Sequence, residues 1–302
     1  MAAETPVFFV VGQQKSGTTW LMRMLDAHQE ILCRGEGRFF GAGWRQKSLV
    51  KSDEMRPPSS LLYALREAEY LRLWVERSVW SRIDDADEHL DNLARMAVDY
   101  FLQGELAKTG KRLVGDKSPL LTPETVEEIS AVYPEARLVH IIRDGRDSAV
   151  SAAHPARNFG RAKGERREED GLFAPAQIRK LAADWNARVG RAVEDGPRLF
   201  GDRYAEVCYE DLLARPEEEM ARLLSFLGAA ADERSGGRCV GAASFERLSK
   251  GRSPGEEDPS SFFRKGVSGD WRNTFTEEDR RVFEQAAGDL LVQLGYDDRG
   301  PP

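Results

Sequence analysis

The sequence has few of the residues that build disulfide frameworks, metal sites and membrane spans. It contains three cysteines, an odd number without metal-site spacing, and four histidines. Reduced thiols in a cytosol are therefore expected. No apolar run approaches the ~20 residues that a membrane helix needs. The first apolar run, residues 7–11, is too short for the core of a secretion signal. These absences predict a cytoplasmic protein without a membrane partner.

A surplus of positive charge is also missing. The 44 Lys and Arg are outnumbered by 51 Asp and Glu, which gives a formal net charge of −7. A nucleic-acid partner is therefore not expected, because such binding needs cations that displace counterions. The 302 residues are 41% hydrophobic and 31% charged, which is typical of an ordinary globular protein with a sizeable core. We expect one domain over residues 1–302.

Short apolar runs alternate with helical patterns along the chain. Residues 7–11 read as a buried strand that ends at Gly12, and residues 18–28 follow with helical periodicity. Further strands are expected at 137–142 and 205–209, and an acidic helix at 216–227. This alternation predicts an α/β fold, with a central parallel sheet flanked by helices in a P-loop-like three-layer sandwich.

Residues 37–110 contain no convincing strand and are expected to form a helical insertion in that domain. The amphipathic stretches 61–80 and 90–106 lie within it, and a further helix is predicted at 177–193. Two stretches, 158–171 and 228–261, are rich in charged or small residues and are expected to be mobile. No heptad or repeat predicts an oligomeric state.

A loop with a glycine joins the first strand to the first helix and reads "GQQKSGTTW" over residues 12–20. Helix N-termini bind anions through open N–H groups and the helix dipole. Gly17 permits close approach of the backbone, and the neighbouring hydroxyls of Ser16, Thr18 and Thr19 add donors. A loop for ATP and magnesium carries lysine directly after its second glycine, where this chain has Thr18. We expect Lys15, placed earlier, to reach across the mouth of the loop.

Three separated segments together resemble the sulfotransferases that use 3′-phosphoadenosine 5′-phosphosulfate (PAPS). "KSGTTW" at 15–20 resembles their 5′-phosphosulfate loop, and "IIRDGRDSAVS" at 141–151 resembles their 3′-phosphate motif. "FFRKGVSGDWRNTFT" at 262–276 resembles the C-terminal segment of the cytosolic branch. The resemblance implies transfer of a sulfuryl group from PAPS to a hydroxyl of a small or medium-sized acceptor. Adenosine 3′,5′-bisphosphate is released, and no metal is required.

The 3′-phosphate of PAPS needs cations away from the loop, and arginine can grip phosphate through two parallel bonds. By resemblance, five residues form this second site: Arg143, Ser151, Arg264, Lys265 and Gly266. Three aromatic side chains are similar to those around the purine in the family: Trp20, Tyr209 and Phe245. We expect Arg146 to be paired within its own turn rather than to bind ligand.

The acceptor's proton needs a base, and the phenol-directed enzymes use a histidine in a Lys-Thr-His stretch. The corresponding residues 115–119 contain no histidine. Glu36, eight residues past His28, resembles the glutamate base of tyrosylprotein sulfotransferases. Lys117 matches the lysine that assists the transferring sulfonate in the tyrosylprotein and heparan branches. Lysines nearby would favour the charged form of Glu36 and weaken it as a base, unless burial opposes this effect. Asp116 is the rival carboxylate, and His154 is the remaining histidine candidate.

Two other functions remain open at this point. A nucleotide or small-molecule kinase of related fold would need lysine directly after Gly17 and an acid for magnesium after a strand, and the displaced Lys15 argues against it. A catalytically idle nucleotide-binding or scaffold protein would have no use for Glu36 and Lys117 beside the loop. The leading hypothesis is the sulfotransferase.

Overall fold

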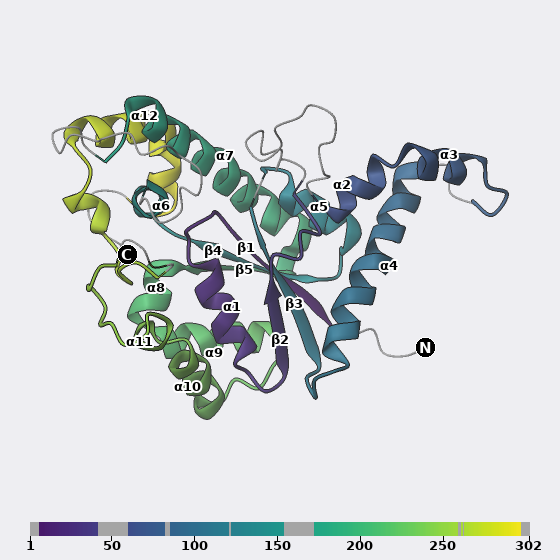
Figure 1. The fold of residues 1–302 in the computed structure, drawn as a ribbon, viewed down its shortest axis with the longest axis horizontal. Helices are drawn as coiled ribbons and strands as arrows, with labels where there is room; N and C mark the ends of the chain where they lie inside the picture. The colour runs from purple at the N-terminus through teal and green to yellow at the C-terminus, as the bar shows by residue number, and fades with distance from the viewer. Residues whose placement is uncertain are drawn as a thin grey trace.

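The protein folds around a parallel sheet. The computed structural model describes residues 6–41, 60–81, 85–120, 122–153, 172–258, 261 and 263–296. Five strands pair in the order β2-β3-β1-β4-β5, all parallel (Figure 1). The strands are β1 (Val7–Gly12), β2 (Ile31–Gly35), β3 (Leu113–Pro119), β4 (Arg137–Ile142) and β5 (Tyr204–Cys208).

Helices follow the strands along the chain and cover the sheet. Those before β4 are α1 (Thr18–Asp26), α2 (Leu61–Arg66), α3 (Glu69–Arg77), α4 (Ala86–Leu106) and α5 (Thr125–Val132). After it come α6 (Gly145–Ala153), α7 (Pro175–Phe200), η2 (Gly201–Arg203), α8 (Tyr209–Ala214), α9 (Pro216–Leu227), α10 (Glu233–Ala242), α11 (Phe245–Leu248), η3 (Asp270–Asn273) and α12 (Glu277–Gln293). No helix in these described ranges is long and apolar enough to cross a membrane.

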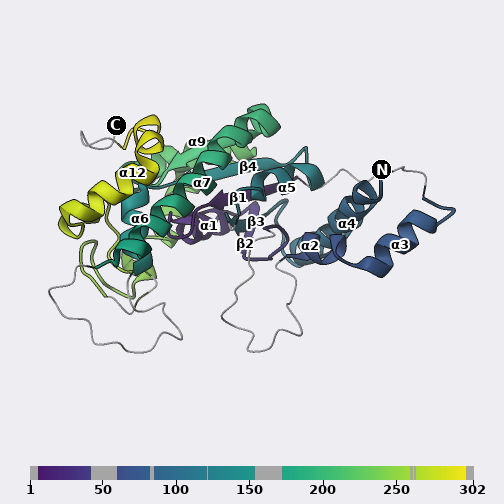
Figure 2. The same cartoon turned by 90° about the horizontal axis from the view of Figure 1, so that it is seen from above.

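The core has a layer on each face of the sheet, because side chains alternate along a strand. Phe8 and Val10 of β1 pack with residues of α1, α8, α9 and α10. Phe9 and Val11 point the other way, toward residues of α4, α5 and α7. A third cluster joins α6, α7 and α12 (Figure 2). The predicted α/β fold with helices on both faces is confirmed.

Most of the predicted elements are present. β4 and α9 have the predicted bounds, β1 extends one residue further, and β5 begins one residue earlier. Within the described part of 37–110 the chain forms α2, α3 and α4 and no strand, as expected, although the stretch 61–80 is two helices rather than one.

Two expectations were incomplete or wrong. β2 and β3 were not predicted as strands, and they form the part of the sheet on the other side of β1 from β4 and β5. The segment 228–261, expected to be mobile, contains α10 and α11, because Cys239 of α10 and the adjoining Ala243 are buried against α1 and α9. The other segment expected to be mobile, 158–171, lies outside the described residues.

Candidate active site

The loop after β1 turns tightly at the carboxyl end of the sheet. Ser16 closes the turn, because its backbone N–H (3.1 Å) and its Oγ (2.7 Å) both donate to the carbonyl of Gln13. Lys15 (φ 76°) and Gly17 (φ 94°) are in the left-handed region. α1 begins at Thr18 without a side-chain cap from Gly17. The first N–H groups of the helix are therefore presented to an anion.

One cavity of about 330 Å³ opens over this loop. It is lined by fourteen of the fifteen predicted site residues: Lys15, Gly17, Thr18, Thr19, Trp20, Glu36, Lys117, Arg143, Ser151, Tyr209, Phe245, Arg264, Lys265 and Gly266. Ser16, the fifteenth, is buried and closes the turn behind the cavity. The loop residues 13–19 with Glu36 and Lys117 are called the loop cluster here, and Arg143, Arg264 and Lys265 the arginine cluster.

Glu36 and Lys117 form an ion pair at one side of the cavity. Lys117 Nζ lies 2.7 Å from Glu36 Oε1, and the lysine side chain is only 4% exposed whereas the glutamate side chain is 63% exposed. β2 and β3 bring them together, since Gly35 pairs with Lys117 in the parallel register. A side chain at Gly35 would place Cβ 2.9 Å from Lys117 Cε, so glycine makes room for the lysine. The backbone N–H of Glu36 also donates to the carbonyl of Lys117 (2.9 Å).

The rival base Asp116 faces away from the cavity. Its carboxylate accepts from Ser118 Oγ (2.6 Å) and from the N–H of Gly37 (3.1 Å). Burial raises the pKa of Asp116, in spite of these hydrogen bonds. It is not among the residues that line the cavity. Asp116 therefore holds the turn beside Glu36 rather than facing a substrate.

The described histidines also lie away from the cavity. His28 Nε2 contacts the carbonyl of Ala230 (3.0 Å), and His89 contacts Ser81 Oγ (2.6 Å). His140 is buried within β4, and burial lowers its pKa to about 3. The other histidine candidate, His154, lies outside the described residues.

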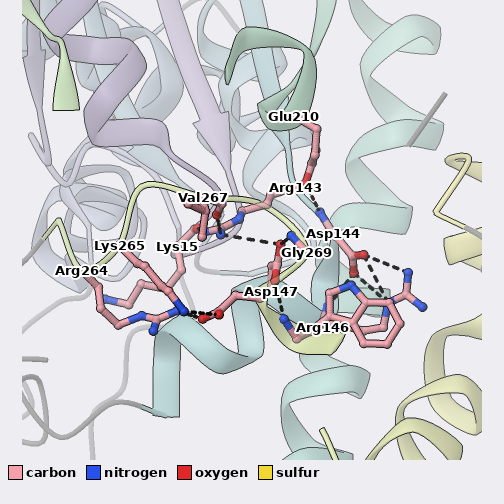
Figure 3. A network of polar contacts seen from close by, with 12 residues as sticks. Lys15, Arg143, Asp144, Arg146, Asp147, Glu210, Arg264, Lys265, Val267 and Gly269 are labelled. Atoms are coloured by element: carbon pink, nitrogen blue, oxygen red, sulfur yellow. Dashed lines mark hydrogen bonds and ion pairs between the residues drawn. The ribbon is translucent and has the colours of Figure 1, made fainter. Parts of the chain in front are cut away.

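Arg143 connects the two clusters, which the sequence did not show. Its guanidinium donates to the carbonyl of Lys15 (3.1 Å) and to that of Val267 (3.0 Å) (Figure 3). The guanidinium carbon also lies 4.3 Å from the centre of the Tyr209 ring. Arg143 is buried by these contacts and holds the loop against the C-terminal segment. Val267 of that segment lies 124 residues after Arg143 in the sequence. Val267 binds Arg143 through its backbone carbonyl, which every residue has, so the sequence gives no signal from which this contact could be predicted.

Arg264 and Lys265 reach the cavity from the C-terminal segment. Arg264 forms ion pairs with Asp270 and with Glu257, and Arg264 Nη1 lies 2.7 Å from Glu257 Oε1. Lys265 Nζ lies 2.6 Å from Asp270 Oδ1. Gly266 follows in the left-handed region (φ 66°), and a Cβ there would lie 2.3 Å from the Phe245 ring. Glycine is therefore required where this backbone meets Phe245.

The three predicted aromatic side chains surround the cavity. Trp20 and Tyr209 meet edge to face at 5.5 Å, and Trp20 Nε1 donates to the carbonyl of Ala243 (2.9 Å). A Cβ at Gly17 would lie 2.6 Å from the Tyr209 ring. Residues that line the cavity without having been predicted include Gln14, Arg38, Phe40 and Phe263. Gln14 lies in the loop 12–20 and Phe263 in the segment 262–276, so both are close to residues that were predicted.

Arg146 pairs within its own turn after β4, as expected, but the side chains of this turn are buried rather than exposed at the surface. Arg146 binds Asp144 (2.8 Å), and its guanidinium carbon lies 3.7 Å from the centre of the Trp271 ring. Asp147 was not predicted to act. Its carboxylate accepts from the N–H groups of Gly269 (2.6 Å) and Trp271 (2.9 Å) and lies 3.8 Å from Arg143. These contacts join α6 to the C-terminal segment (Figure 3).

The model of the sulfotransferase family matches residues 6–233. The chain belongs to the sulfotransferase family. Protein-tyrosine sulfotransferase 2 of Gallus gallus is 25% identical over 234 residues, 74% of this chain and 52% of that protein. Nodulation protein NoeE of Sinorhizobium fredii is 26% identical over 304 residues, 96% of this chain and 66% of that protein. The chain thus spans about half the length of several curated relatives that it matches.

Solved sulfotransferases share the fold. The mouse sulfotransferase SULT7A1, solved in complex with PAP, has a TM-score of 0.55 at 17% identity, over 98% of this chain and 87% of that one. The sulfotransferase domain of the Synechococcus olefin synthase has a TM-score of 0.53 at 18% identity, over 93% and 94%. These likenesses agree with the three-layer arrangement of the sulfotransferase chain described above.

Proposed function

We propose that this sulfotransferase moves the sulfuryl group of PAPS to a hydroxyl of a small or medium-sized acceptor and releases adenosine 3′,5′-bisphosphate. One observation carries the proposal: the loop cluster and the arginine cluster line the same cavity, with aromatic side chains beside both. A nucleotide with anionic groups at two separate positions fits such a cavity. The mouse sulfotransferase SULT7A1 was solved with PAP, which is adenosine 3′,5′-bisphosphate, and so was a retinol dehydratase of the same fold. Both structures support this choice of nucleotide.

The site fits the donor on its own contacts. Gly17 lets the Tyr209 ring pack against the loop, and the uncapped start of α1 suits a phosphate. When bound, PAPS supplies an activated sulfuryl group on its 5′-phosphate. Lys15, Thr18 and Thr19 would hold that end, in a turn that the buried Ser16 closes from behind, and the arginine cluster with Ser151 and Gly266 would hold the 3′-phosphate. Trp20, Tyr209 and Phe245 would enclose the purine.

Three side chains would then carry out the transfer. Lys15 stabilises the negative charge that builds on the bridging oxygen of the leaving nucleotide. Lys117 donates to the sulfonate as it moves in line to the acceptor. Glu36 accepts the acceptor's hydroxyl proton. Its exposed position leaves it accessible to an acceptor.

The Glu36–Lys117 pair explains how a carboxylate beside an ammonium acts as a base. In the empty site Lys117 Nζ pairs with Glu36 Oε1 at 2.7 Å. When bound, the sulfonate would offer Lys117 a second anionic partner, and Lys117 would then share its hydrogen bonds and leave Glu36 free to contact the acceptor. The base is then active only when donor is present. The acceptor enters beside Phe40 and Pro119, which line the cavity next to this pair.

Ligand-induced thermal shifts test the donor assignment. The protein is titrated with adenosine 3′,5′-bisphosphate and with ADP plus magnesium, and the first should stabilise it at lower concentration. Stronger stabilisation by ADP with magnesium would instead support the kinase. Labelled PAPS, offered with phenols, aliphatic alcohols, sugars and tyrosine peptides in separate reactions, then identifies the acceptor class. The cytoplasmic location and the absence of a metal requirement stay predictions.

A further inference from the structure

A carboxylate lies behind the two cations of the C-terminal segment. Asp270 is 5% exposed, and it binds Lys265 Nζ at 2.6 Å as well as the Arg264 guanidinium. Arg264 and Lys265 line the cavity, whereas Asp270 does not. The two cations therefore have the cavity on one side and this carboxylate on another.

The backbone at Asp270 is held from both sides. The N–H groups of its neighbours, Gly269 and Trp271, both donate to the buried carboxylate of Asp147 (Figure 3). The carbonyl of Asp270 accepts from Thr274 Oγ1 at 2.9 Å. Moving the backbone at Asp270 would break these bonds, and buried donors left without partners are costly. The backbone therefore stays in place when a ligand arrives, and the carboxylate, only 5% exposed, stays close to its two cations.

Asp270 carries its negative charge at neutral pH. Burial acts to raise its pKa, but hydrogen bonds and positive charge from Lys265 and Arg264 outweigh burial and lower the pKa. A phosphate that binds the same two cations must share them with this fixed charge. Like charges that share a site repel one another, most strongly where water is excluded.

We propose that Asp270 is a fixed counter-anion that weakens binding of the 3′-phosphate and so hastens release of the bisphosphate product. The inference rests on the proposed function, because it requires the arginine cluster to bind that phosphate. Asp270 holds Arg264 and Lys265 in position in the empty site and opposes the phosphate in the filled one. Release of product limits turnover in many enzymes, so a weaker site can be a faster one.

The decisive variant is Asp270→Asn, which keeps the size of the side chain and removes its charge. We expect affinity for adenosine 3′,5′-bisphosphate to rise about tenfold, while affinity for AMP, which lacks the 3′-phosphate, stays within about twofold. Calorimetry measures both. The product should also dissociate more slowly in stopped-flow displacement, and steady-state kcat should fall while the single-turnover rate is unchanged.

Two controls separate charge from structure. Glu257, whose side chain is 33% exposed, is the other carboxylate that pairs with Arg264. Glu257→Gln should leave the affinities for both nucleotides within about twofold of the wild-type values. Asp270→Glu keeps the charge and should retain the weak bisphosphate affinity. The proposal is overturned if Asp270→Asn weakens binding of the bisphosphate, or changes both nucleotides alike. A wild-type protein with no preference for the bisphosphate over AMP would instead overturn the proposed function itself.

Discussion

The loop cluster and the arginine cluster bring positive charge to one cavity by different means. The loop residues are consecutive, and a strand, a left-handed glycine and a helix start set their geometry. The arginine cluster joins residues 143 and 264–265, which buried carboxylates and backbone carbonyls help to hold together. Local geometry therefore suffices for residues 13–19 of the loop cluster. Glu36 and Lys117 depend on the pairing of β2 with β3, and the arginine cluster depends on the packing of the C-terminal segment against β4 and α6.

The comparison predicts different consequences of substitution. The loop cluster is proposed to act on the group that is transferred, so changes there should reduce the rate of the chemical step. The arginine cluster is proposed to hold a phosphate that does not react, so changes there should reduce affinity and selectivity. The expected effects below run from the largest to the smallest.

The largest effects are expected at Lys15 and Glu36. Lys15→Ala and Glu36→Gln should each lower kcat by at least ~10²-fold, because one removes the cation at the leaving oxygen and the other the base. Turnover of labelled PAPS with saturating acceptor measures this. Glu36→Gln should leave bisphosphate affinity unchanged, which shows that the donor site is intact. Full activity of Glu36→Gln, with an inactive His154→Ala, would transfer the role of base to His154.

The next effect tests the arginine cluster alone. Arg264→Ala should weaken bisphosphate binding about 10- to 100-fold, the range expected for loss of one charge-assisted contact. AMP should bind nearly as well as to the wild type. Calorimetric titrations with the two nucleotides check this difference. Equal losses for both nucleotides would mean that the C-terminal segment supports the whole cavity and that the two clusters are not separable.

A smaller effect concerns the backbone of the loop. Gly17→Ala places a Cβ at φ 94° and 2.6 Å from the Tyr209 ring, so we expect a loss of about 1–3 kcal/mol in the free energy of unfolding. Gly190→Ala is the matched control. Gly190 lies within α7, where alanine favours the helix, and the new Cβ would lie 3.6 Å from Leu290 of α12. Urea unfolding of both variants gives the comparison. A Gly17→Ala protein as stable as Gly190→Ala would contradict a strained, closely packed loop.

The effect that is smallest at neutral pH arises in the sheet beneath both clusters. His140 Nδ1 lies 2.8 Å from the Tyr204 hydroxyl. That hydroxyl donates its own proton to Glu206, so its oxygen accepts from His140 and Nδ1 carries the imidazole proton. The buried Nε2 of His140 has no hydrogen-bond partner. Its pKa of about 3 lies below the unfolded value near 6.5. The unfolded state therefore binds an extra proton below pH 6.5, and stability falls as pH falls.

His140 should contribute up to about 1.4 kcal/mol of lost stability per pH unit between pH 6.5 and 3. His140→Gln cannot titrate, so its unfolding free energy should depend less steeply on pH than that of the wild type. Chemical unfolding at pH 5, 6 and 7 measures the difference. Parallel curves for the two proteins would show that His140 is not held neutral.

Sequence patterns predicted β1, β4 and β5 well and missed β2 and β3. β1 and β4 are continuous apolar runs, which is typical of strands buried on both faces. β3 reads Leu-Val-Gly-Asp-Lys-Ser-Pro, and these residue types disfavour a strand. It forms because Asp116 and Lys117 find partners in Gly37 and Glu36. Such partners lie across the sheet and leave no periodic signal.

The sequence by itself determined the α/β order, the loop after the first strand and the types of residue that meet the ligand. Those features depend on neighbours along the chain, where the preferences of glycine, apolar runs and helix starts act directly. Only the tertiary structure decided that Asp116 turns away from the cavity, that Arg143 joins the two clusters, and that Asp270 lies behind Arg264 and Lys265. A buried charge is placed by whichever partners the fold brings within hydrogen-bonding distance, because without a partner its burial would cost too much.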